Sequence, residues 1–168
     1  GEFGVVLVTG SRTPAMSINV DWAGTQQFCL DVAMELDELM ALYEAEKKLF
    51  LEETRLIAQG PGRFVKWFEN LTINVLGPQR YRELLVSVYN EAAPILEAAG
   101  KCVMVHYDGA LKVIANHIAS APFHMVESLT EPPEGDMRYD ECRAAWPDKV
   151  LWANVNVGLY HLPEAALR

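Results

Sequence analysis

Short apolar runs alternate with longer helical stretches along the whole chain, and this alternation restricts the fold more than any other feature. The runs are rich in valine, leucine and aromatic residues, and glycine or polar residues end them, as is typical of buried strands. Strands separated by helices run parallel and cross over with one hand. The sequence therefore predicts a parallel α/β fold with five strands, at residues 4–10, 63–73, within 101–111, 124–129 and 149–157.

Apolar residues recur at helical spacing between these runs. Glycine or proline marks the end of most of these stretches, and proline also follows the start of one. The predicted helices cover residues 25–59 with a break near 35–37, 77–100 with a kink at Pro94, 110–120, and a short segment between Asp136, its expected N-cap, and Pro147.

Composition limits the classes of partner. The chain has 168 residues, a length that suits one domain over residues 1–168. A net charge of −9 would repel phosphate backbones, so we expect no nucleic-acid partner. There is no apolar segment of membrane-spanning length and no pattern of a signal peptide, so we expect a cytoplasmic protein that does not bind membranes.

Polar side chains stand at the ends of four successive predicted strands. In parallel β/α units the carboxyl ends of all strands meet at one rim, so we expect these side chains to lie together and to line a polar site. Glu131, Glu134 and Asp136 also follow a strand, but solvent contact or helix capping explains them well. The predicted site residues are Glu69, Asn70, His106, Asp108, Glu127, Asn154 and Asn156.

His106 and Asp108 form the most informative pair. Side chains alternate along a strand, so both should project to one side and Tyr107 to the other. The same alternation predicts Glu127 on one side with Leu129, and Asn154 with Asn156. A carboxylate beside an imidazole can orient the ring and favour its protonation, so the pair is suited to proton transfer.

An ordered set of motifs resembles the uroporphyrinogen decarboxylase superfamily, especially its decarboxylase-like and corrinoid methyltransferase-like branches. Members of that family have an acidic residue before "NL" at one strand end, a helix finishing at "GK", a strand ending in "H-x-[D or C]-G", and a later "PP-x-GD" loop. The matching residues here are Glu69-Asn70-Leu71, Gly100-Lys101, His106-Tyr107-Asp108-Gly109 and 132–136.

The resemblance implies a (β/α)8 barrel, of which five strands would form the C-terminal part, from about the fourth strand to the eighth. It implies decarboxylase or methyltransferase chemistry on a small polar or tetrapyrrole-related substrate, with catalytic His106 and Asp108 and substrate-binding Glu69, Asn70, Glu127, Asn154 and Asn156. The expected lumen is acidic, which suits a polyanionic tetrapyrrole poorly.

The family's zinc-dependent methyltransferases have cysteine where this chain has Asp108, and a second cysteine in the last strand, near Asn154 or Asn156 here. We therefore expect no required cofactor, and keep a metal site on His106, Asp108 and Glu127 as the less favoured alternative.

Two other interpretations stay open. A five-stranded parallel sheet would leave one face and both edges uncovered, so the chain could be an inactive half-barrel that acts as an assembly module, either as a homo-oligomer or with a complementary half-barrel. An open doubly wound domain would also use five strands. It would need a phosphate-binding glycine loop after the first strand, and residues 9–16 lack that spacing.

Overall fold

The five strands form one parallel sheet whose spatial order equals their order in the chain. We describe it from a computed structural model, which covers residues 4–71 and 73–167. The strands are β1 (Leu7–Gly10), β2 (Phe64–Trp67), β3 (Cys102–His106), β4 (Met125–Leu129) and β5 (Val150–Ala153). Every neighbouring pair is parallel. The predicted α/β class is thus confirmed, as part of a (β/α) barrel-like unit.

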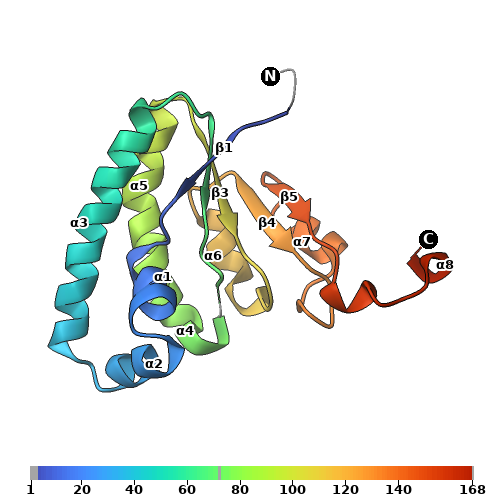
Figure 1. The fold of residues 1–168 in the computed structure, drawn as a ribbon, viewed down its shortest axis with the longest axis horizontal. Coiled ribbons are helices and arrows are strands. Elements are labelled where there is room, and N and C mark those ends of the chain that lie inside the picture. Colours follow the sequence, from blue (N-terminus) through green and yellow to red (C-terminus); the bar gives the residue numbers. More distant parts are fainter. Residues whose placement is uncertain (1–3, 72, 168) are drawn as a thin grey trace.

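Helices connect the strands in the predicted alternation (Figure 1). Short 3-10 segments, η3 (Lys112–Ile114) and η4 (Val157–Leu159), and two π-helical segments, η1 (Ile18–Trp22) and η2 (Tyr81–Val86), accompany them. The α-helices are α1 (Pro14–Ser17), α2 (Thr25–Ala33), α3 (Asp37–Gln59), α4 (Ile73–Arg80), α5 (Ser87–Ala98), α6 (Ala115–Ser120), α7 (Tyr139–Ala145) and α8 (Glu164–Leu167).

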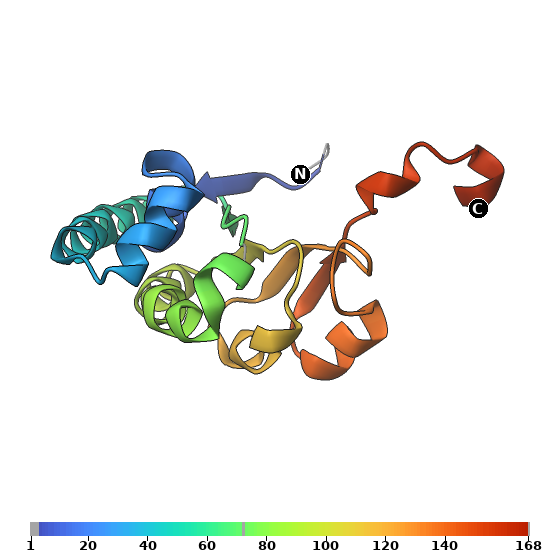
Figure 2. The ribbon, with the colours of Figure 1, turned by 90° about the horizontal axis from the view of Figure 1, so that it is seen from below.

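Helices α3 to α7 lie on one side of the sheet, whereas the C-terminal segment with α8 extends away on the other side (Figure 2). The covered face carries the core. Trp67 of β2 stacks on Tyr89 of α5 with ring centroids 5.4 Å apart, and Phe50 of α3 packs on Trp67 at 5.5 Å. Val103 and Val105 of β3 are also fully buried there. Burial of these side chains holds α3 and α5 against the sheet.

The other face, which we call the open face, receives the alternate side chains of each strand. Strand register places Lys66 beside Met104 and Met104 beside Met125. On β5 the outward residues Val150 and Trp152 remain about half exposed. The open face is therefore accessible and only partly polar.

Strand β2 is shorter than predicted. It ends at Trp67, and Asn70 adopts a left-handed φ of 47°, so the chain turns before Leu71 and Ile73. Those two residues are buried in the core, but they do not belong to the strand. Their apolar character explains the prediction of a strand to residue 73; Thr72 lies outside the described residues.

The predicted break near 35–37 is confirmed, because α2 ends at Ala33 and α3 begins at Asp37. The chain also leaves helical geometry at Gly77, whose φ is 75°, and α5 includes Pro94. The predicted N-cap of α7 was wrong. Asp136 does not cap α7: its carboxylate accepts hydrogen bonds from the backbone N–H groups of Leu111 (2.6 Å) and Lys112 (3.0 Å), and so holds the start of η3. Within the described residues, no helix is both long enough and apolar enough to cross a membrane.

Candidate functional site

A histidine, a glutamate and a lysine meet on the open face of the central strands. His106 of β3 and Glu127 of β4 are partners in the strand register. The Nδ1 atom of His106 lies 2.5 Å from Oε2 of Glu127, and the ammonium of Lys66 lies 2.7 Å from the same oxygen. All three side chains are largely buried, so these charged contacts are only weakly screened by solvent.

The aromatic ring of Phe68 packs against two members of this His106–Glu127–Lys66 cluster. The Lys66 ammonium lies 4.2 Å from the ring centroid of Phe68, a cation–π distance, and the Phe68 ring lies 5.5 Å from the imidazole of His106. The sequence reasoning missed Lys66. The sequence does indicate it, because Lys66 is a lysine inside the apolar run "RFVKWF", and a lysine on a buried strand needs an acidic or hydrogen-bonding partner.

The second imidazole nitrogen of His106 faces the rim. Its Nε2 lies 4.0 Å from Oδ2 of Asp108, whose side chain is half exposed. Asp108 also lines a cavity of about 620 Å³ at the carboxyl ends of the strands, together with Ser128, Thr130 and Asn154. That volume is ordinary for a small-molecule site. An imidazole held by Glu127 at one nitrogen can accept or donate a proton at the other.

Glu69 lies away from this cluster. It is fully buried on the helical side, where Thr13 donates to Oε2 through Oγ1 (2.8 Å) and the backbone N–H (3.3 Å). Tyr89 Oη donates to Oε1 at 3.0 Å, and Tyr107 Oη lies 2.8 Å from Tyr89 Oη and 3.0 Å from Tyr81 Oη. Burial raises the pKa of Glu69 to about 7, although these hydrogen bonds oppose the rise.

The structure does not bring Glu69 into contact with His106 or Asp108. The register explains this, because Trp67 pairs with Val105 and a strand continued by two residues would pair Glu69 with Tyr107, on the covered face opposite to His106. β2 in fact stops at Trp67 and the chain turns, and Glu69 still lies on the covered side. Asn70, next in the sequence, is exposed on that turn and does not line the rim cavity. Their predicted role in substrate binding stays a prediction that this arrangement does not favour.

The two predicted asparagines hold the loops after β4 and β5. Asn154 donates from Nδ2 to Ser128 Oγ at 3.1 Å and accepts from the next backbone N–H at 2.9 Å. Asn156 donates to the backbone oxygen of Glu131 at 3.1 Å. Asn154 faces the rim cavity with Asp108, whereas Asn156 does not line it. Both therefore shape the rim, and only Asn154 adjoins the space where a ligand would bind.

A bulge changes the alternation predicted for β4. The register shifts between Glu127 and Leu129, and Ser128 has a left-handed φ of 72°. Leu129 therefore joins the core cluster with Val126 instead of sharing a face with Glu127. The same bulge directs the Ser128 hydroxyl toward Asn154.

The cluster does not fit a divalent cation. The Lys66 ammonium already contacts the Glu127 oxygen that a metal would need, and His106 Nδ1 contacts it too. Across the described residues, no three or more His, Cys, Asp and Glu side chains are placed to hold a metal ion. Cys102 begins β3, and Cys142 lies on α7. The absence of a required cofactor stays a prediction, with zinc as the less favoured alternative, and metal analysis of the purified protein would test it.

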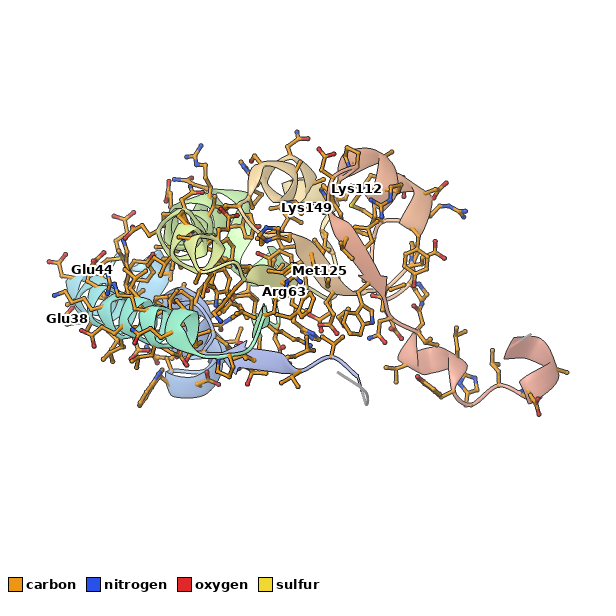
Figure 3. The ribbon with its side chains drawn as sticks, turned by 90° about the horizontal axis from the view of Figure 1, so that it is seen from above. Glu38, Glu44, Arg63, Lys112, Met125 and Lys149 are labelled. Atoms are coloured by element: carbon orange, nitrogen blue, oxygen red, sulfur yellow. The ribbon has the colours of Figure 1, made fainter. Side chains whose placement is uncertain are left out.

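A second cavity, of about 690 Å³, lies among α2, α3 and η2 and is unrelated to this cluster. Glu44 is one of its lining residues. Figure 3 shows Glu44 at the far end of α3, well away from Met125 in the sheet. Of the two cavities, the rim cavity is the one that Asp108, the neighbour of His106, lines.

Comparison with solved structures finds a methyltransferase from Methanosarcina mazei, with a TM-score of 0.66 at 11% sequence identity. The match covers 87% of this chain and 42% of that protein, so the chain spans less than half the length of this neighbour. No family model matches the sequence, and no curated protein matches it. The likeness supports a methyltransferase-like fold and leaves the uroporphyrinogen decarboxylase resemblance without independent support.

Proposed function

We propose that the chain is the catalytic-rim part of a (β/α) barrel enzyme, related to the uroporphyrinogen decarboxylase superfamily, that carries out decarboxylase- or methyltransferase-type chemistry on a small polar substrate. The observation that carries the proposal is the short contact between His106 and Glu127 beside a cavity at the carboxyl ends of parallel strands. Such rims are where enzymes of this architecture place their chemistry.

Each side chain has a distinct role. Glu127 accepts the Nδ1 proton of His106 and fixes the tautomer, which leaves Nε2 free to interact with Asp108, a residue that lines the rim cavity. His106 then transfers a proton at Nε2. In a decarboxylation that proton ends on the carbanion, and in a methyl transfer it ends on the leaving heteroatom. Lys66 keeps the carboxylate of Glu127 in place.

The tautomer of His106 tests the premise. Long-range ¹⁵N–¹H NMR spectra of the protein should show the neutral imidazole protonated at Nδ1, and Glu127→Gln should change that pattern. The control is Glu97→Gln, which removes a carboxylate 3.7 Å from the exposed His124 and should leave His106 unchanged.

Activity tests the conclusion. Small carboxylates and methyl donors with a thiol acceptor would be assayed with the wild-type protein and His106→Asn. We expect turnover of one substrate class and a loss of about 10²-fold or more in the variant. Equal rates in both proteins, or no turnover of either class, would reject the proposal.

The open face favours a second candidate, an assembly function. Trp152 and Val150 on β5 are about half exposed there, and Val155 and Val157 on the following segment are exposed too. A second copy, covering one open face with the other, would bury these side chains.

Light scattering at micromolar concentration should then show a homodimer or larger species, and Trp152→Glu should dissociate it. The control variant is Leu56→Glu, which changes an exposed leucine of α3, whose helix lies on the covered side. A folded wild-type monomer would eliminate this candidate.

A further inference from the structure

Lys66 is a buried primary amine, and the proposed proton transfer uses its positive charge but not its capacity as a nucleophile. It lies in the second strand of the sheet, its residue is 8% exposed, and its side chain points to the open face. Lysine is seldom buried in proteins unless it is paired. Glu127 supplies the pair, yet a fixed amine beside an acid and an imidazole is also the arrangement that nucleophilic lysines use.

Three functions that imine chemistry requires meet within this cluster. The amine is Lys66 Nζ, and Glu127 Oε2 at 2.7 Å is a base that can take its proton. His106, whose Nδ1 lies 2.5 Å from that same oxygen, carries a proton to the rim side. The Phe68 ring, 4.2 Å from Nζ, covers one side of the amine and excludes water there.

Other charged groups around the amine do not compete for it. Within the described residues, Glu127 is the ion-pair partner of Lys66, and the same carboxylate oxygen also contacts Nδ1 of His106. Asp108 faces His106 from the rim. On the two strands that adjoin β2, the register partners of Lys66 are Thr9 of β1 and Met104 of β3, and neither is charged. Once Glu127 holds a proton, the amine has a neutral acid and uncharged neighbours beside it.

We propose that Lys66 is a nucleophile that forms an imine with a small 3-oxo acid, and that decarboxylation proceeds through this imine. The proposal rests on the proposed function for its proton carrier, His106, and adds to it the substrate class and the electron-accepting group. Arginine, which is cationic but not nucleophilic, could not replace lysine in this role.

The electron balance needs no external oxidant or reductant. The Lys66 lone pair adds to the ketone carbon, the C–O bond breaks, and the oxygen leaves as water, which gives a protonated imine. The bond between the α-carbon and the carboxylate then breaks, CO₂ leaves, and its bonding electrons form a neutral enamine. His106 delivers a proton to the α-carbon, and water hydrolyses the imine to release the ketone and the free amine.

Reductive trapping tests this directly. The protein would be incubated with acetoacetate and sodium cyanoborohydride, and peptide mass spectrometry would locate the reduced adduct. We expect labelling of Lys66 in excess of Lys48 and Lys112, which are exposed lysines in the same chain. Labelling of the exposed lysines without Lys66 would overturn the proposal.

Two variants separate a nucleophile from a counter-ion. Lys66→Arg keeps a positive charge beside Glu127 and removes the amine, while Lys66→Met removes both. We expect CO₂ release from acetoacetate to fall to the background rate in both, with circular dichroism confirming that Lys66→Arg remains folded. Activity retained in a folded Lys66→Arg protein would overturn the proposal, since the charge alone would then suffice.

His106→Asn distinguishes the two proposals. If Lys66 is still trapped in this variant while CO₂ release is lost, both proposals hold. If Lys66 is trapped and release is unchanged, the role of His106 fails and that of Lys66 stands. If Lys66 is not trapped in the wild type, the lysine proposal fails whatever His106 does.

Discussion

The buried carboxyl of Glu69 predicts a specific dependence of stability on pH. Burial raises its pKa from the ordinary 4.5 to about 7, because the ionised form loses its hydration on the helical side of the sheet. The folded protein therefore holds this proton more tightly than the unfolded chain does. Glu69→Gln removes the titration while the amide can still accept from Thr13 and donate to Tyr89.

The sign follows from linkage. Below pH 4.5 the carboxyl is neutral in both states and imposes no penalty. As pH rises from 4.5 to 7 the unfolded chain loses the proton first, so the free energy of unfolding falls; above 7 the loss is complete. A pKa change of this size corresponds to about 3 kcal/mol.

Urea denaturation at a series of pH values measures this term. As pH rises from 4.5 to 8, the wild type should lose about 3 kcal/mol of unfolding free energy relative to Glu69→Gln, which lacks this titration. Glu52→Gln, on the exposed side of α3, is the control for loss of one acidic residue. If the Glu69→Gln and wild-type profiles run parallel across that range, the buried carboxyl is not responsible for any pH dependence.

Two further substitutions test the packing around the site. Gly135→Ala would place a Cβ 1.9 Å from the backbone oxygen of Thr130, so we expect a loss of about 1–3 kcal/mol in unfolding free energy. The control is Gly60→Ala, whose Cβ would lie 3.4 Å from the backbone oxygen of Ile57, an ordinary contact distance, and should change stability much less. Tyr107→Phe removes the hydroxyl that joins two other buried tyrosine hydroxyls and should cost about 1–3 kcal/mol, whereas Tyr160→Phe, on an exposed ring, should change stability by less than about 0.5 kcal/mol. Chemical denaturation at pH 5 measures both pairs, and equal losses in test and control variants would contradict the packing argument.

The approximate location of each strand could be predicted from the sequence, because each strand is an apolar run followed by residues at helical spacing. The parallel direction of the strands could be predicted too, because helices connect them. The alternation of side chains also predicted that His106 and Asp108 lie near each other, and they are 4.0 Å apart, whereas the contact of His106 with Glu127 depends on the register of β3 with β4. These are properties of single strands and their immediate neighbours, which local sequence encodes.

The position of each strand end could not be predicted, since buried loop residues are as apolar as strand residues. Leu71 and Ile73 are core residues outside the sheet, so the predicted strand ran past its real end at Trp67. Glu69 lies on the covered side with Trp67, two residues before it, and not with His106. The bulge at Ser128 depends on register with β5, a contact between chain segments that no periodicity records. Lys66 was missed because its partner is distant in sequence.

The sequential strand order has a consequence for biogenesis. Each strand hydrogen-bonds only to the strands immediately before and after it in the chain. During translation, each of the strands β2 to β5 can therefore pair with the preceding strand, which has already been synthesised. None of these four strands needs a later part of the sheet before it can form its first strand pair. Growth of the sheet can follow the ribosome from the first unit to the last.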